Sequence, residues 1–159
     1  MRPSELWKSM PPEKKLSAAT AFWNDEHGRE QQVEVIVTLA RKLNFRPKSV
    51  PALPLERRAK LLAGMDVSDA VASRALIAYH LTAERPMMGA FLDALAIEHE
   101  NGLITAEEVP APDKAKLEEA VSTLRASFPE DAVRLYLHTL LLLDGDTWAD
   151  LAGLVAEEA

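Results

Sequence analysis

The chain has 159 residues, of which 48% are hydrophobic and 27% are charged, so it has the size and composition of one globular domain and not of a disordered segment. It contains no cysteine, which excludes disulfides, thiolate metal sites and cysteine nucleophiles. Its formal net charge of −7 disfavours a general nucleic-acid binder.

The sequence predicts neither a secretory signal nor a membrane-spanning helix. The opening residues, MRPSELWKSMPPEKK, include no apolar core of a secretory signal. The longest aliphatic run, Leu140 to Leu143, is far shorter than the roughly 20 residues that cross a bilayer. We therefore expect a soluble, cytoplasmic protein that does not contact a membrane.

Helical patterns begin near the N-terminus. Residues 11–25 and 29–44 carry apolar side chains at three- and four-residue spacing, which predicts two amphipathic helices. The second includes VEVIVT, a β-branched run that is also typical of a strand, but no turn residue interrupts the pattern before Asn44. The apolar stripe predicted for this helix is Val33, Ile36, Val37, Ala40 and Leu43.

A proline-rich loop is predicted over residues 46–54, since each proline removes a backbone donor and restricts the residue before it. A short helix then runs from about Leu55 to Gly64, a glycine that suits a left-handed C-terminal cap. Ser68 is placed to cap the next helix, which extends to residue 85.

The second half of the chain continues in helices. They are predicted over residues 87–101, 114–127, 131–143 and 147–159. A second loop, at 109–112, separates the first two of them. Asp113 can cap the helix that follows this loop, and Ser127 with Glu130 has the spacing of a capping box for the next.

These elements predict the all-α class, as a compact orthogonal bundle of seven or eight short helices in a single domain over residues 1–159. Pro47, Pro86 and Pro129 each follow a helical segment, at spacings of 39 and 43 residues that approach the length of helical-hairpin repeats. A short α-solenoid of helical hairpins is therefore the alternative, although the residues around these prolines do not align well.

The stretch IEHENGLITAEEV resembles the second half of a calcium loop. With Gly102 at position 6 of an EF-hand, Ile97 and His99 would stand at positions 1 and 3, where the loop needs oxygen ligands. Calcium binding is therefore disfavoured. Helix chemistry explains the same letters: Asn101 and Gly102 would end one helix, and a capping box from Thr105 to Glu108 would start another.

The histidines form no known metal-binding spacing, because Glu-x-x-His, His-x-x-x-His and HExxH are all absent. His80 and Glu84 lie four residues apart, where an exposed ion pair is the plainest interpretation. If His99 met them across the helix pair joined by Pro86, the three side chains would form a polar pocket. His80, Glu84 and His99 are therefore the candidate pocket for a small molecule or a metal.

No catalytic constellation is present in the sequence. It has neither a glycine-rich phosphate loop nor a G-x-S-x-G elbow, and its acidic pairs fit solvated helix faces. We predict no catalytic residue, no cofactor and no bound metal, and the expectation leans towards a non-enzymatic protein.

Charge is distributed unevenly along the chain. The basic segment, residues 41–60, has seven cations against one anion, a balance of +6. Its cations are Arg41, Lys42, Arg46, Lys48, Arg57, Arg58 and Lys60. The acidic stretch, residues 98–119, has seven anions against two cations, a balance of −5. Two such patches favour electrostatically steered association. The plainer interpretation of the basic segment is a solvated surface whose charges pair with acidic helices of its own molecule.

The leading prediction is a protein-interaction module that uses the basic segment, with another protein or a second copy of the chain as its partner. The alternative is a helical protein that binds a small molecule or a metal near His80, Glu84 and His99. A nucleotide or RNA ligand for the basic segment is disfavoured, because Phe45 is the only aromatic residue within it.

Overall fold

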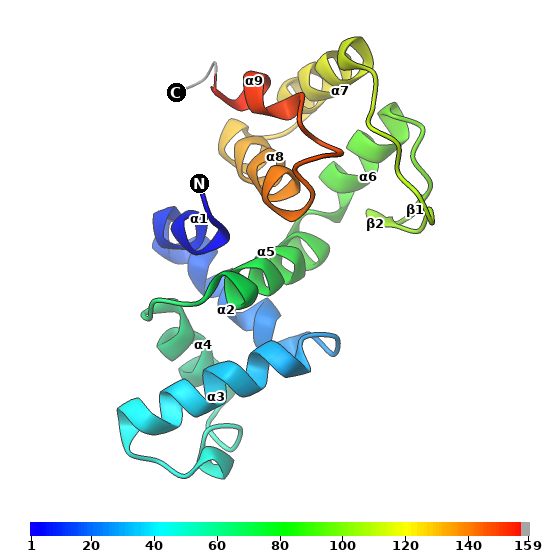
Figure 1. The fold of residues 1–159 in the computed structure, drawn as a ribbon. Coiled ribbons are helices and arrows are strands. Elements are labelled where there is room, and N and C mark those ends of the chain that lie inside the picture. Colours follow the sequence, from blue (N-terminus) through cyan, green and yellow to red (C-terminus); the bar gives the residue numbers. More distant parts are fainter. Residues whose placement is uncertain (157–159) are drawn as a thin grey trace. The chain divides into compact units, whose positions relative to one another are not determined.

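The computed structural model describes residues 1–156, which confirm the all-α prediction (Figure 1). These residues form nine α-helices, one or two more than predicted, with one 3-10 helix and a small β-hairpin. The helices are α1 (Pro3–Ser9), α2 (Pro12–Asn24), α3 (Arg29–Leu43), η1 (Pro47–Ser49), α4 (Leu55–Ala63), α5 (Asp69–Ala83), α6 (Arg85–Ala94), α7 (Lys114–Ser127), α8 (Glu130–Leu143) and α9 (Leu151–Ala156). None of these helices is long and apolar enough to cross a membrane.

The chain divides into two compact units, an N-terminal unit of Met1–Tyr79 and a C-terminal unit of His80–Ala159. The division falls within α5, so one continuous helix contributes its first turns to one unit and its last turn to the other. The prediction of one domain over residues 1–159 stays a prediction.

In the N-terminal unit, α2 packs against α4 and buries Phe22 and Leu62 completely. A polar corner joins α2 to α3. There the Gln32 side chain donates to the carbonyl oxygens of Phe22 and Asp25, both at 2.9 Å, and Arg74 of α5 pairs with the Asp25 carboxylate. Unpaired carbonyls at the end of α2 are thus satisfied inside the unit.

Helix α3 forms as predicted, but Ala40 is the one residue of the predicted stripe that is buried. Val35, Leu39 and Ala40 are buried, whereas Val33 and Val37 are 56% and 38% exposed. The run VEVIV carries apolar residues on more than one side of a helix, so spacing alone could not decide which side meets the core.

The helix ends were predicted with mixed success. The left-handed cap lies at Asn44 (φ 55°), which ends α3, and not at Gly64, which ends α4 with φ −90°. Ser68 caps α5 as predicted, since its Oγ accepts a hydrogen bond from Val71 N at 3.3 Å. The capping box of Ser127 and Glu130 is wrong, because Ser127 belongs to the last turn of α7 and Pro129 occupies the cap position of α8.

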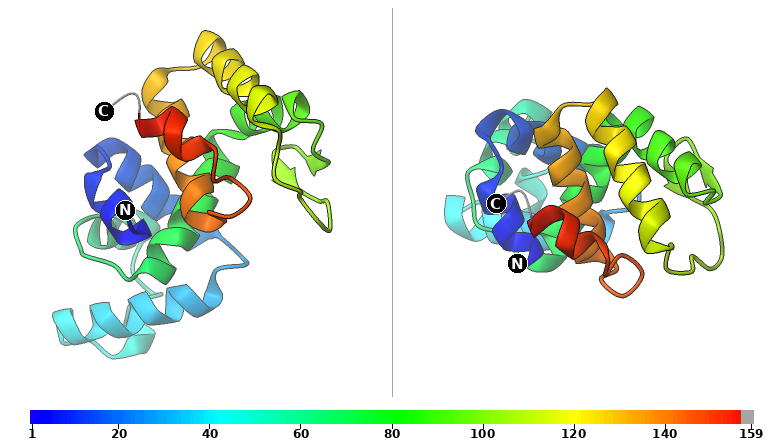
Figure 2. Two further views of the ribbon diagram at one scale, coloured as in Figure 1. Left: turned by 45° about the horizontal axis from the view of Figure 1, so that its top comes forward. Right: turned by 90° about the horizontal axis from the view of Figure 1, so that it is seen from above.

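In the C-terminal unit, α6 lies against α7, α7 against α8, and α8 against α9 (Figure 2). One apolar core joins these four helices. Its largest fully buried members are Met87, Phe91, Leu92, Leu117, Leu124, Leu137 and Leu151. Trp148, which precedes α9, is buried in the same core at 3% exposure.

The Asn-Gly corner is a β-hairpin, so the helix predicted over 87–101 ends instead at Ala94. Strands β1 (His99–Glu100) and β2 (Leu103–Ile104) pair antiparallel around Asn101 and Gly102. Both corner residues have positive φ, 49° and 91°, as a two-residue type I′ hairpin turn requires. The predicted capping box of Thr105 and Glu108 is also wrong, because residues 105–113 contain no helix.

Candidate functional site

His80 belongs to the aromatic core of the C-terminal unit. It is 2% exposed, and its ring lies 5.5 Å from that of Tyr136, which packs edge-on against Phe91 at 5.6 Å between ring centroids. Burial raises the pKa of Tyr136, so the phenol stays neutral at physiological pH. These contacts give His80 a packing role.

His99 holds the hairpin against α6. Its Nδ1 accepts a hydrogen bond from Gly102 N at 3.0 Å, and its Nε2 lies 2.7 Å from Asp93 Oδ1. Because Nδ1 is the acceptor, the ring proton of neutral His99 lies on Nε2 and is donated to Asp93. Both nitrogens therefore have partners within the unit, which leaves neither as a base for a substrate.

Glu84 occupies the N-cap position of α6, where its backbone N–H donates to His80 O and its carbonyl accepts from Met88 N. The structure places these three predicted residues in three settings: a packed core, a helix junction and a hairpin. Among the described residues, no group of three or more His, Asp or Glu side chains is arranged to hold a metal. The pocket of His80, Glu84 and His99 stays a prediction.

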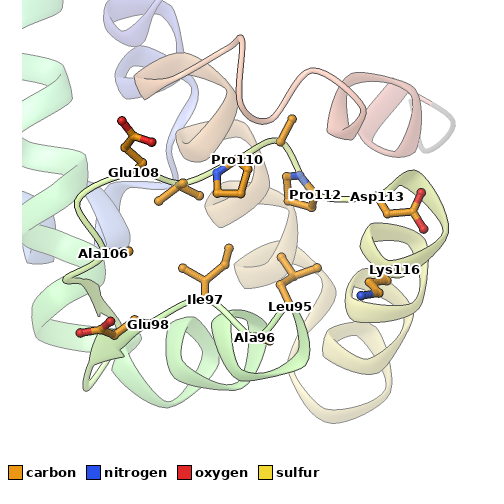
Figure 3. A pocket seen from close by; sticks show the side chains of 12 residues that line it. Leu95, Ala96, Ile97, Glu98, Ala106, Glu108, Pro110, Pro112, Asp113 and Lys116 are labelled. Carbon is orange, nitrogen blue, oxygen red and sulfur yellow. The ribbon is translucent and has the colours of Figure 1, made fainter.

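A groove opens in the same unit between the end of α6 and the segment 105–113, which spans from the hairpin to α7 (Figure 3). Its volume is about 410 Å³. The side chains of Leu95 and Ile97 point into the opening, and Pro110 and Pro112 face them from the spanning segment. We call this feature the 105–113 groove; none of His80, Glu84 and His99 lines it.

The rim of the 105–113 groove is acidic. Glu98 and Glu108 lie at one end of the opening and Asp113 lies at the other, with their carboxylates directed outward, while Lys116 is the one cation in the lining (Figure 3). The carboxylates of Glu108 and Asp113 form no ion pair with any described residue, and the Glu98 carboxylate accepts only a 3.4 Å hydrogen bond from Thr105 Oγ1 among the described residues. An apolar floor with a net negative rim suits a ligand that is apolar and cationic.

A smaller cavity of about 280 Å³ continues from this groove along α7. It shares Leu95, Ala96 and Lys116 with the groove and adds Glu119 and Thr123. The two cavities together extend the concave surface over the first three turns of α7.

The basic segment lies on the N-terminal unit, at the end of α3, in η1 and on α4. Six of its seven cations are exposed, Arg58 being the exception. Arg58 Nε donates to Leu53 O at 3.1 Å, and its guanidinium lies 5.2 Å from the centre of the Trp23 ring, so this residue stabilises the fold. Lys60 pairs with Glu56 at 3.1 Å.

The other five cations of the basic segment form no ion pair with any described residue. They are Arg41, Lys42, Arg46, Lys48 and Arg57. Within the N-terminal unit, no carboxylate pairs with any of these five cations. The structure leaves their charges available to solvent or to a partner.

Exposed apolar side chains accompany the unpaired cations. Phe45 is 37% exposed and stands directly before Arg46, in a run from Asn44 to Ser49 in which every residue is exposed. Val33 and Val37 precede Arg41 at four-residue intervals, which places all three on one side of α3. This surface therefore combines positive charge with apolar area.

Part of the 105–113 groove was predictable from the sequence. The acidic stretch and the loop at 109–112 were both predicted, but the cavity between that loop and α6 was not. Two prolines in three residues, Pro110 and Pro112, were the available signal, because they prevent the segment from joining a sheet or continuing a helix. The partners of that segment, Leu95 and Ile97, could not be assigned without the fold.

No protein-family model, curated protein or solved structure gives a significant match to this chain. Its function must therefore be inferred from its own residues.

Proposed function

We propose that the chain is a protein-interaction module whose basic segment, residues 41–60, binds an acidic protein surface. The observation that supports this most directly is the set of five exposed cations that no described carboxylate neutralises. Like charges held together on a folded surface repel one another, so their retention has a cost that an acidic partner would remove. Exposed Phe45 and Val37 supply the apolar contact area that charges alone lack.

A protein partner accounts for these features better than a nucleic acid does. Phe45 is the only aromatic side chain in the segment, whereas single-strand binders stack successive bases on several aromatic rings. The remainder of the chain is strongly acidic, because its net charge is −7 in spite of this segment. A phosphate backbone would be repelled by that remainder along most of its length.

The proposal is tested by fluorescence anisotropy with a labelled oligoglutamate peptide as a model acidic polypeptide and a single-stranded RNA of equal length as the comparison. We expect the peptide to bind more tightly than the RNA, and the binding to weaken several-fold as salt shortens the Debye length from about 8 Å to about 3 Å.

Charge-reversal variants locate the binding surface. Lys48→Glu and Arg57→Glu change exposed, unpaired cations and should each weaken peptide binding several-fold. Arg29→Glu is the matched control, because it makes the same charge change at an exposed residue about 18 Å from Arg41 along α3. Equal loss of binding in all three variants, or tighter binding of the RNA, would refute the proposal.

A further inference from the structure

We propose that the partner of the basic segment is the 105–113 groove of a second copy, so that the chain associates head to tail. This inference rests on the proposed function and names the acidic surface that the basic segment binds. The segment that enters the groove, which we call the occupant, is the exposed run Asn44–Ser49, and Phe45 is its large apolar side chain.

The two surfaces are complementary in charge. The groove lining has three carboxylates against one cation, and Glu108 and Asp113 form no ion pair with any described residue. The occupant carries Arg46 and Lys48, also unpaired within the described chain. Each surface thus presents the charge that the other lacks, and pairing them adds no uncompensated ion to the interface.

The two surfaces are also complementary in polarity. The groove has an apolar floor, of which Leu95 and Ile97 are the side chains that point into the opening (Figure 3). Its volume of about 410 Å³ lies within the range of pockets that hold small ligands, so an aromatic side chain fits it in size. Phe45 is the exposed aromatic side chain of the basic segment, and cations follow it at 46 and 48.

Such a contact joins two different surfaces of identical chains. It is therefore heterologous, and each added copy leaves one basic segment and one groove unoccupied unless the assembly closes into a ring. A contact made by one short loop in one groove is small compared with the roughly 800 Å² per partner of stable complexes, so we expect weak association that depends on concentration.

The first test is sedimentation equilibrium of the wild-type chain over a range of concentrations at about 0.15 M salt, where the Debye length is about 8 Å and the net repulsion between copies is screened. We expect the average mass to rise with concentration and to return to that of the monomer at about 1 M salt. A monomer at every concentration would overturn the inference.

Two charge reversals then test the two surfaces separately. Lys48→Glu alters the basic run Asn44–Ser49 and leaves the 105–113 groove intact. Glu108→Lys alters the groove and leaves the basic run intact. Each variant alone should remain monomeric. The matched controls are Arg29→Glu and Glu118→Lys, which reverse exposed charges outside the two surfaces and should associate like the wild type.

Mixing the two monomeric variants gives the decisive result. The intact segment of the Glu108→Lys chain can enter the intact groove of the Lys48→Glu chain, and the two reversed charges attract each other across the remaining pair of surfaces. We expect the mixture to associate where each variant alone does not, which also shows that both variants are folded. A mixture that stays monomeric, or a Glu108→Lys chain that associates normally, would overturn the inference.

This experiment separates the two proposals. If the wild-type chain is monomeric but binds oligoglutamate through Lys48 and Arg57, the self-association fails and the proposed function stands. If the peptide does not bind either, both fail.

Discussion

Replacing Gly102 by alanine should destabilise the C-terminal unit more than any other glycine-to-alanine change in its hairpin and α6. Gly102 has φ +91°, and a Cβ added there would lie 2.9 Å from Met88 Cβ and 3.3 Å from Arg85 O. Neither neighbour can move freely, since Met88 Cβ and Arg85 O both belong to residues within α6. The substitution therefore strains the backbone and crowds the contact at once.

The expected loss follows from these two effects. A left-handed backbone conformation costs an L-residue about 1–2 kcal/mol. Overpacking against a close-packed neighbour costs about 1–3 kcal/mol. We therefore expect the Gly102→Ala variant to lose about 2–5 kcal/mol of unfolding free energy, unless the hairpin detaches locally and limits the loss to the free energy of that opening.

Urea unfolding followed by circular dichroism measures the global effect, and hydrogen exchange at the Thr105 amide, which donates to Glu98 O at 3.1 Å, reports the local opening. Gly89→Ala is the matched control. Gly89 lies within α6, and its added Cβ would meet His99 Cε1 at an ordinary 3.5 Å, so this change should stabilise by up to about 1 kcal/mol. Unchanged stability and unchanged Thr105 exchange in Gly102→Ala would refute the reasoning.

Two further predictions concern the N-terminal unit. Burial raises the pKa of Asp25, but hydrogen bonds from Arg74 and His27 N outweigh it, so the pKa lies below the ordinary 3.8. Asp25→Asn should therefore lower the free energy of unfolding by about 1.5–3 kcal/mol at neutral pH. In urea unfolding this loss should shrink as the pH falls through and below 3.8, because the wild-type carboxylate is then protonated and no longer contributes its stabilisation. A loss that does not depend on pH contradicts this. Arg58→Ala should lower the free energy of unfolding by about 1–2 kcal/mol, because it removes the contacts to Trp23 and Leu53 O. In the same urea measurement, the neighbouring Arg57→Ala should change it by no more than about 0.5 kcal/mol. Equal effects of the two changes would contradict a stabilising role for Arg58.

Elements that depend on local chemistry were predictable from the sequence. The helix expected over 29–44 occupies Arg29–Leu43, and the one expected from Leu55 ends at Ala63. Both are bounded by residues that act on their own neighbours, such as prolines that remove a donor and glycine or asparagine at a helix end. Ser68 belongs to the same group, because its hydroxyl needs only the backbone three residues later.

Features decided by distant contacts were not predictable. Asn101 and Gly102 suit a left-handed helix cap and a type I′ turn equally, because both need positive φ. The hairpin is held by contacts with α6: Arg85 Nη1 donates to Asn101 O at 2.8 Å, and Gly102 closely approaches Met88. The buried side of α3 was mispredicted for the same reason, because its apolar residues lie on more than one side of the helix and only contacts with other helices decide which side is buried.

The 105–113 groove combines both kinds of cause. Pro110 and Pro112 act locally, because they keep the segment from pairing with β2 or from joining α7. The hairpin then fixes where that segment starts, and Asp113, at the N-cap of α7, fixes where it ends. A chain held at both ends and unable to form regular structure must bridge the end of α6 instead of packing flat on it. Its carboxylates then face solvent around an apolar floor, which is the arrangement that a cationic and apolar loop of a second copy can use.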